Sequence, residues 1–202
     1  MPKRLFDFIL AFAGLVFLLP LFIAIAIWIK IDSKGPAFFR QWRVGQFGRK
    51  FKIYKFRTMI EDAESKGGKI TTSNDPRITN SGKFLRRHKL DELPQLINVL
   101  RGDMSFVGPR PEVSKYVEMC QDDYRDVLKV KPGITDLASL KFRDESSILE
   151  KSDNPEKVYL AQILPEKIWL AKEYLKRSSM LFDLKIIFAT VFDKKIGLGG
   201  KD

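Results

Sequence analysis

The chain has 202 residues, of which 45% are hydrophobic, so it is long enough for one sizeable core and one main domain. Its formal net charge of +11 indicates an anionic partner, which could be a nucleic acid, an anionic membrane surface or a phosphorylated substrate. The single cysteine, Cys120, excludes an internal disulfide and fits a reducing, cytosol-facing location.

An apolar tract fills the first thirty residues. From Leu5 to Ile29 the only charged residue is Asp7, and this length could cross a bilayer. A signal peptide is disfavoured because apolar sequence continues through Trp28, beyond the candidate cleavage site. A plain transmembrane helix has to accommodate Pro20, which removes one backbone hydrogen bond and kinks a helix.

Charge placement favours a third interpretation, a helix that returns to the face it came from. Lys3 and Arg4 mark one end of the tract as cytoplasmic, and residues 40–57, with seven Lys/Arg and no acid, mark the other end as cytoplasmic too. A helix broken at Pro20 satisfies both, because its first segment would be about 22 Å long, short of a core about 30 Å thick. A plain span remains the alternative.

The predicted organisation is therefore a monotopic membrane protein with a single cytosolic domain. Residues 1–30 form the re-entrant membrane anchor helix, and residues 31–202 form the cytosolic-face domain. Residues 51–56 resemble a short strand after several turn signals, which predicts a small β-hairpin or a loop carrying Arg and Lys. Residues 61–82 are polar and contain Asp75-Pro76, so we expect a surface loop there.

Helical periodicity dominates the C-terminal stretch. Its apolar residues recur on one side of a helix, at Leu181, Leu184, Ile187, Phe188 and Val191. Core packing explains this pattern, and an interfacial amphipathic helix lying on the membrane is the second interpretation. The predicted fold class is mainly α with a small β-hairpin element (α+β), together with interfacial amphipathic helices.

The run "HKLDELPQ" at 88–95 places two adjacent carboxylates, Asp91 and Glu92, within strongly basic sequence. Leucines recur after them at helical spacing, and Pro94 is tolerated only in a first turn, so a helix begins close to Asp91. Acids at this position ordinarily act as helix caps. The nearby arginines and the glycine-rich "RGDMSFVGPRP" favour instead a diphosphate-binding site, where a carboxylate can recruit a divalent metal or attack phosphorus.

Four segments resemble the bacterial sugar transferase family of monotopic phosphoglycosyl transferases. They are "KFRTM" at 55–59, "LRRHKLDELPQLINVLRGDMSFVGPRPE" at 85–112, "KPGIT" at 131–135 and "LPEKIWLAKEYLKRSSMLFDLKIIFATV" at 164–191. The resemblance implies an enzyme of the bacterial inner membrane whose catalytic domain, residues 31–202, lies on the cytoplasmic face. Such an enzyme moves a sugar-1-phosphate from a UDP-sugar to polyprenol phosphate and uses Mg²⁺.

The same resemblance assigns site residues and partners. Asp91 would be the nucleophile that carries a covalent phosphosugar intermediate, and Glu92 would be its partner in the metal and proton chemistry; both are candidate metal ligands. Pro109, Arg110 and Pro111 would line the nucleotide site, with Arg110 near phosphate. The implied partners are the UDP-sugar, polyprenol phosphate and membrane lipids; an oligomer is compatible with them, and no nucleic acid is expected.

Four further basic residues are weaker candidates for phosphate contacts: Lys55, Arg57, Arg86 and Arg87. A basic face against lipid headgroups explains each of them equally well. The chain also departs from many relatives at Leu19, where they have serine before the proline, and at Asp136, where they have glycine. The second departure could reshape the adjacent loop or the sugar pocket.

Two rivals remain open. One is a membrane-tethered basic binding module for RNA or anionic lipid, in which the aromatic and basic residues of 40–57 supply stacking and charge. No recognisable nucleic-acid motif accompanies that stretch. The other is a glycosyltransferase that moves sugar without phosphate. The nucleotide product separates all three: UMP for phosphosugar transfer, UDP for sugar transfer, and neither for the binding module.

Overall fold

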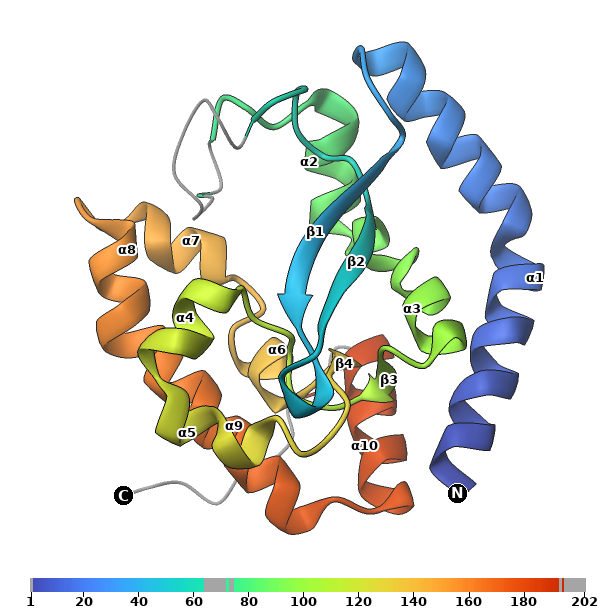
Figure 1. Cartoon of the computed structure of the whole chain (residues 1–202). Helices are drawn as coiled ribbons and strands as arrows, with labels where there is room; N and C mark the ends of the chain where they lie inside the picture. The colour runs from blue at the N-terminus through green and yellow to red at the C-terminus, as the bar shows by residue number, and fades with distance from the viewer. Residues whose placement is uncertain (1, 64–71, 73–74, 193, 195–202) are drawn as a thin grey trace.

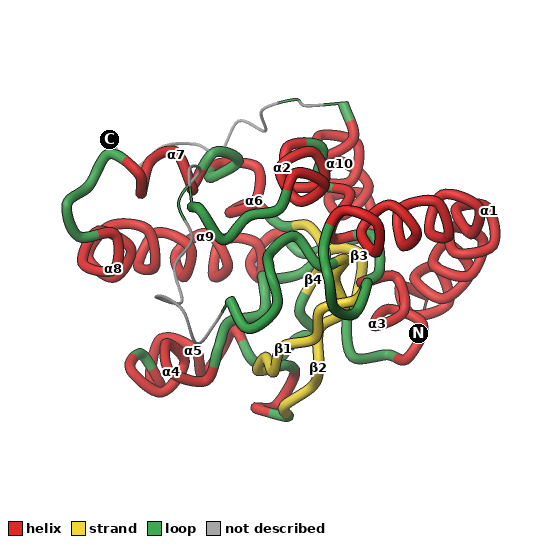
Figure 2. The backbone as a smooth tube through the Cα atoms, turned by 90° about the horizontal axis from the view of Figure 1, so that it is seen from above, coloured by secondary structure: helices red, strands yellow, loops and turns green. Residues whose placement is uncertain are grey.

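The structure is a computed structural model, and it describes residues 2–63, 72, 75–192 and 194. Helices predominate, as predicted, and two short strand pairs lie near the centre (Figures 1 and 2). The helices are α1 (Pro2–Asp32), α2 (Asn80–Arg87), α3 (Gln95–Arg101), α4 (Ser114–Met119), α5 (Gln121–Val127), α6 (Leu137–Lys141), α7 (Glu145–Glu150), α8 (Pro155–Val158), α9 (Leu164–Arg177) and α10 (Met180–Val191). The strands are β1 (Phe38–Val44), β2 (Lys50–Phe56), β3 (Ser105–Val107) and β4 (Gly133–Thr135). Figure 2 shows α1 and α3 on one side of the strands, and α4, α5, α8 and α9 on the other.

The predicted interruption of the first helix at Pro20 is not found. α1 is one helix of 31 residues with Pro20 inside it, and the helix curves along its length rather than breaking (Figure 1). Proline removes only its own donor, while the neighbouring backbone groups of an apolar segment are best satisfied by continued helix. By length and composition α1 is able to cross a membrane.

Polar contacts join both ends of α1 to the rest of the domain. At the N-terminal end, the Lys3 ammonium lies 2.5 Å from the Asp183 carboxylate and donates to the Tyr174 hydroxyl at 2.9 Å. At the C-terminal end, the Asp32 carboxylate accepts hydrogen bonds from the Ser81 backbone N–H and hydroxyl, at 2.9 and 2.8 Å. Both ends of the helix are therefore attached to one domain.

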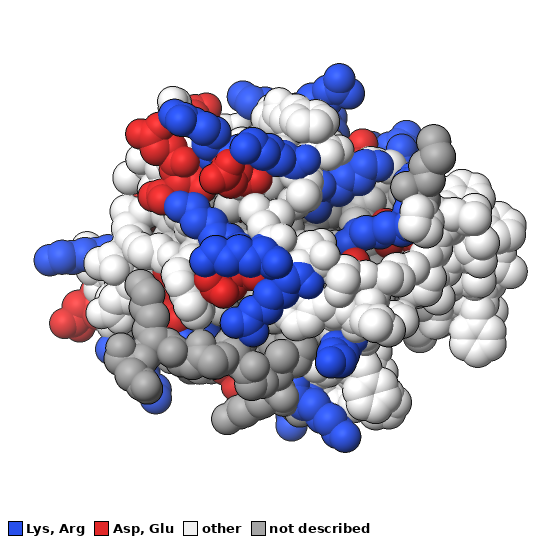
Figure 3. All heavy atoms as spheres, turned by 90° about the horizontal axis from the view of Figure 1, so that it is seen from below, with Lys and Arg blue, Asp and Glu red and all other residues white. Residues whose placement is uncertain are grey.

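Between these ends, α1 has one buried side and one exposed side. Ala11 packs against α3, and Phe22 and Ile29 pack in a cluster with Phe56 and Leu85. The opposite side exposes large apolar residues: Leu5, Ile9, Phe12, Val16, Phe17, Leu19, Ile23, Ile27 and Ile31. In Figure 3, the right-hand side of the molecule, where α1 lies, is almost entirely uncharged.

The predicted β-hairpin is confirmed. β1 pairs antiparallel with β2, with Phe38 opposite Phe56 and Val44 opposite Lys50. Alternation along β2 turns Phe51 and Ile53 into the core beside α3. The same alternation turns Lys55, at the end of the strand, toward the site described below.

The second strand pair, β3 with β4, is parallel and was not predicted. It pairs Ser105 with Gly133, and so brings the segments around "VGPRP" and "KPGIT" side by side. The approach is too close for side chains, because a Cβ on Gly133 would lie 2.2 Å from the Gly108 nitrogen and one on Gly108 would lie 2.3 Å from the Lys131 carbonyl oxygen. The Gly133 N–H donates to the Pro109 carbonyl at 3.0 Å, which fixes the start of the Pro109–Pro111 segment.

Candidate active site

Asp91 and Glu92 lie in a single 3₁₀ turn, Leu90–Glu92, that leads into α3. The prediction that a helix begins close to Asp91 is therefore confirmed. The residue before the turn, Lys89, adopts the left-handed conformation (φ 56°, ψ 21°) and makes no side-chain cap. In the described chain, neither carboxylate accepts a hydrogen bond that would cap this turn. Helix capping therefore does not explain why two acids stand here.

The Asp91 carboxylate is buried but unbonded. The residue is 9% exposed, and within the part of the chain that the structure describes no group donates a hydrogen bond to its side chain. Burial raises the pKa of Asp91, while the charges of Lys55, Arg86 and Lys89 act against that rise. Its oxygens are free to act on an electrophile or a cation.

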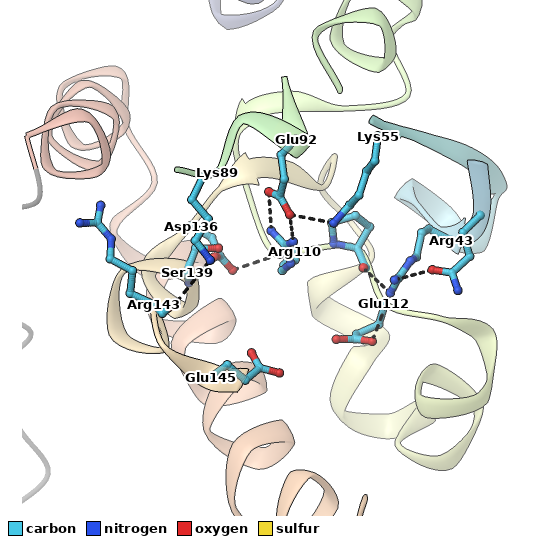
Figure 4. Close-up of polar contacts among 12 residues, drawn as sticks. Arg43, Lys55, Lys89, Glu92, Arg110, Glu112, Asp136, Ser139, Arg143 and Glu145 are labelled. Atoms are coloured by element: carbon cyan, nitrogen blue, oxygen red, sulfur yellow. Dashed lines mark hydrogen bonds and ion pairs between the residues drawn. The ribbon is translucent and has the colours of Figure 1, made fainter. Parts of the chain in front are cut away.

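The neighbouring Glu92 is held by two cations (Figure 4). Its carboxylate lies 2.8 Å from the Lys55 ammonium and accepts from the Arg110 guanidinium at 3.2 Å, with a second, closer contact between the same two groups. Burial acts to raise the pKa of Glu92, but the charges and hydrogen bonds of Arg110 and Lys55 hold it well below its usual value. Glu92 is thus a fixed counter-ion, already fully bonded.

Arg110 is positioned through its backbone as well as its side chain. Its N–H donates to Asp136 at 3.1 Å, and the other oxygen of Asp136 accepts from the Ser139 N–H at 2.7 Å, capping α6. Asp136, the departure noted in the sequence, therefore ties the Arg110 segment to α6 (Figure 4). The negative charge of Glu92 raises the pKa of Arg110, which stays a cation.

A group of residues that supports the Pro109–Pro111 segment was not predicted from the sequence. Glu112 is buried, accepts from the Tyr159 hydroxyl at 2.6 Å and lies 3.7 Å from the Arg43 guanidinium. Arg43 also donates to the Pro111 carbonyl at 3.4 Å. The one signal in the sequence was the acid directly after the Pro-Arg-Pro run. Its partners come from β1 and from the π-helical segment Tyr159–Ile163 before α9.

Arg57, a weaker candidate for a phosphate contact, does not lie with Asp91 and Glu92 but is bonded to the segment after α1. Its guanidinium donates to the Ser33 carbonyl and hydroxyl, at 2.7 and 2.8 Å, and to the Lys34 carbonyl. Arg57 follows the last residue of β2, where the chain meets the end of α1, and its two terminal nitrogens donate to the carbonyls that directly follow that helix. It therefore fastens the end of α1 to the hairpin.

The two α2 arginines differ. Arg86 is half-buried, and its charge acts on Asp91. Arg87 is exposed, and no described contact joins it to the site. The structure thus brings together Asp91, Glu92, Lys55, Arg86 and Arg110 and leaves Arg57 and Arg87 aside.

The carboxylates of the site suit a magnesium ion that is bound partly by substrate, rather than one coordinated by protein groups alone. Among the described residues, no group of three His, Cys, Asp or Glu side chains could hold a metal. Mg²⁺ is commonly bound by one or two carboxylates, with water and substrate phosphate completing its shell. Asp91 can offer its unbonded oxygens, whereas those of Glu92 are occupied by Lys55 and Arg110.

Comparison with known proteins agrees with this arrangement. Residues 1–195 match the family described as "Bacterial sugar transferase". The "UDP-glucose:undecaprenyl-phosphate glucose-1-phosphate transferase" of Escherichia coli K12 is 41% identical over 198 residues, which cover 94% of this chain and 39% of that protein. The "UDP-N-acetylgalactosamine-undecaprenyl-phosphate N-acetylgalactosaminephosphotransferase" of Aeromonas hydrophila is 34% identical over 206 residues, 98% of this chain and 45% of the relative.

A shorter relative matches over nearly its whole length. The "Exopolysaccharide production protein PSS" of Rhizobium leguminosarum bv. phaseoli is 37% identical over 196 residues, 94% of this chain and 92% of the relative. The chain spans less than half the length of the two named transferases. With a family match over residues 1–195, the chain belongs to the bacterial sugar transferase family.

Proposed function

We propose that this protein transfers a sugar-1-phosphate from a UDP-sugar to undecaprenyl phosphate, giving undecaprenyl-diphosphate-sugar and UMP. The observation that carries the proposal is the contrast between two adjacent buried carboxylates. Glu92 is neutralised by Lys55 and Arg110, whereas Asp91 has no hydrogen-bond partner among the described residues. A carboxylate buried among cations and left unbonded is suited to nucleophilic attack on a phosphate.

The reaction proceeds in two displacements. An Asp91 oxygen attacks the phosphorus nearest the sugar, the bond from that phosphorus to the bridging oxygen breaks, and UMP leaves with the bridging oxygen. An oxygen of undecaprenyl phosphate then attacks the same phosphorus, and the acyl–phosphate bond breaks to restore the carboxylate. Mg²⁺ held by Asp91 and the diphosphate would offset the charge on the departing UMP.

The remaining residues orient the donor. Arg110 and Lys55 are held rigidly by Glu92, so a diphosphate meets preorganised cations instead of mobile ones. Asp136 fixes the Arg110 backbone, and Glu112 with Arg43 supports the neighbouring Pro111. These contacts place positive charge beside Asp91, which lowers the repulsion between a carboxylate and a phosphate.

The nucleotide product tests this proposal. Purified protein with undecaprenyl phosphate and a panel of UDP-sugars should release UMP, measured by chromatography, with at least one sugar. With the acceptor omitted, release should be limited to about one UMP per protein molecule, because the covalent step precedes the lipid. Release of UDP would identify a sugar transferase instead, and no release of either nucleotide would favour a binding module.

We also propose that α1 anchors the domain in the cytoplasmic leaflet of the inner membrane and re-enters the cytoplasm. The support is the attachment of both ends of α1 to the same domain, through Lys3 and Asp32, while its outer side is apolar. A second apolar surface on α10 fits the membrane interface: Leu181, Leu184, Phe188 and Val191 are exposed.

Site-directed labelling tests this topology. In a Cys120→Ser background, Pro2→Cys and Arg40→Cys should both react with a membrane-impermeant maleimide only in inside-out vesicles, because both ends of α1 stay with the cytoplasmic domain. The Cys120→Ser protein is the unlabelled control. Labelling of position 2 in right-side-out vesicles would establish a true span.

A further inference from the structure

The cations near Asp91 fall into two groups by their partners. Lys55 and Arg110 are both paired with Glu92, so much of their charge is already balanced. Arg86 and Lys89 also act on Asp91, yet of the residues at 2–63, 72, 75–192 and 194 none brings a carboxylate into ion-pair contact with either. Of the four cations Lys55, Arg110, Arg86 and Lys89, only the last two therefore lack a carboxylate partner in the described chain.

Lys89 is held in an unusual backbone conformation. It is one of three non-glycine residues with positive φ in the described chain, the others being Phe47 and Asp62. A left-handed lysine costs about 1 kcal/mol or more relative to ordinary conformations, and such residues concentrate at functional sites. This one lies two positions before Asp91, in the connection from α2 to the Leu90–Glu92 turn.

The Lys89 side chain lies beside Asp136 and extends toward Arg143 (Figure 4). Its ammonium donates to the Arg143 carbonyl, in the connection between α6 and α7, at 3.3 Å. This is a single, long hydrogen bond to a neutral acceptor, and an ammonium has three donors. Exchange of that carbonyl for a phosphate oxygen would give the ammonium a negatively charged acceptor in place of a neutral one, and so add an ion-pair attraction to the hydrogen bond.

We propose that Lys89 binds the phosphate nearest the sugar in the nucleotide-sugar donor. The inference rests on the proposed function, since it takes Asp91 to attack that phosphate. Lys89 is the cation closest to Asp91 in sequence and has no carboxylate partner among the described residues, so it can neutralise charge where the new bond forms. Arg110 and Lys55 cannot do this alone, because each must share its charge with Glu92.

Nucleotide binding to the full chain in lipid nanodiscs tests the assignment by titration calorimetry. UDP contains the phosphate in question and UMP lacks it. Lys89→Asn removes the ammonium but keeps a residue that tolerates the left-handed conformation. We expect the Kd for UDP to rise about tenfold and the Kd for UMP to stay unchanged, because one charge-assisted contact is lost.

Two matched variants complete the experiment. Lys89→Arg should keep UDP binding within about twofold of the unmodified protein, since the charge is retained. Lys83→Asn, at an exposed lysine of α2, should leave both nucleotides unaffected. Unchanged UDP binding by Lys89→Asn would overturn the proposal, as would equal losses for UDP and UMP. An unmodified protein that binds neither nucleotide would contradict the proposed function itself, before any variant is compared.

Discussion

Replacing Asp91 by asparagine should leave a folded, membrane-bound protein that releases no UMP and carries no sugar-phosphate adduct. The amide matches the carboxylate in shape but is not a nucleophile, so kcat should fall by roughly 10⁴-fold or more. The structural cost should be small, because no described residue donates a hydrogen bond to Asp91. Burial raises the pKa of Asp91, so the ionised form is disfavoured in the fold and the neutral amide should be at least as stable at pH 7.

Intact-protein mass spectrometry measures the adduct directly. After incubation with donor and no acceptor, the unmodified protein should gain the mass of one sugar phosphate, and Asp91→Asn should gain none. Asp122→Asn is the matched control, because that carboxylate is exposed on α5 and distant in sequence from the Leu90–Glu92 turn. Near-normal UMP release by Asp91→Asn, or ternary-complex kinetics with no trappable adduct in the unmodified protein, would return Asp91 to a structural role or to metal binding alone.

The position of the two carboxylates at a helix start was predictable, because helix starts depend on residues close together in sequence. Pro94 and the leucines after it locate the helix start, and this places Asp91 and Glu92 at the entrance to α3. The long-range contacts were not predictable in the same way. Lys55 and Glu92 are 37 residues apart and Arg110 and Glu92 are 18 apart, and no periodicity in the chain encodes those pairings.

Arg57 illustrates why basic residues are hard to assign. It stands two positions after Lys55, so strand alternation alone would place both side chains on the same face. β2 ends at Phe56, and the chain turns there toward α1, so the Arg57 guanidinium reaches the carbonyls of Ser33 and Lys34 instead. Pro20 shows a local rule outweighed by its surroundings. Proline predicted a break in the helix, but the backbone of this apolar segment is satisfied by continued helical hydrogen bonds, and α1 runs through Pro20.

Replacing Glu92 by glutamine should destabilise the protein more than any other conservative change at the site. The substitution leaves Lys55 and Arg110 facing one another, half-buried, with no carboxylate between them. Loss of one partner from a buried ion pair costs about 3–5 kcal/mol, which for a chain of this size lowers Tm by roughly 6–20 °C. Glu118→Gln, at an exposed residue of α4, is the control and should shift Tm by no more than about 2 °C.

A double variant separates the charge imbalance from simple loss of contacts. In Glu92→Gln with Arg110→Met, one of the two opposed cations is gone, so the Tm measured in detergent should recover about half of the loss, while UMP release stays abolished.

The pH dependence of these Tm values follows from the pKa values of the site. The pKa of Glu92 is depressed, so the stability that Glu92 contributes is fully present above the unfolded carboxyl pKa, about 4.3, and is lost only as pH falls through the lower folded value. Burial lowers the pKa of Lys55, and Glu92 opposes that shift, so Lys55 loses its proton more readily in Glu92→Gln and the Tm difference should be smaller at pH 8 than at pH 6.5. UDP should raise the Tm of Glu92→Gln more than that of the unmodified protein, because its phosphates can take the place of the missing counter-ion. A Glu92→Gln protein as stable as the unmodified one, and no more responsive to UDP, would show that Glu92 does not balance Lys55 and Arg110.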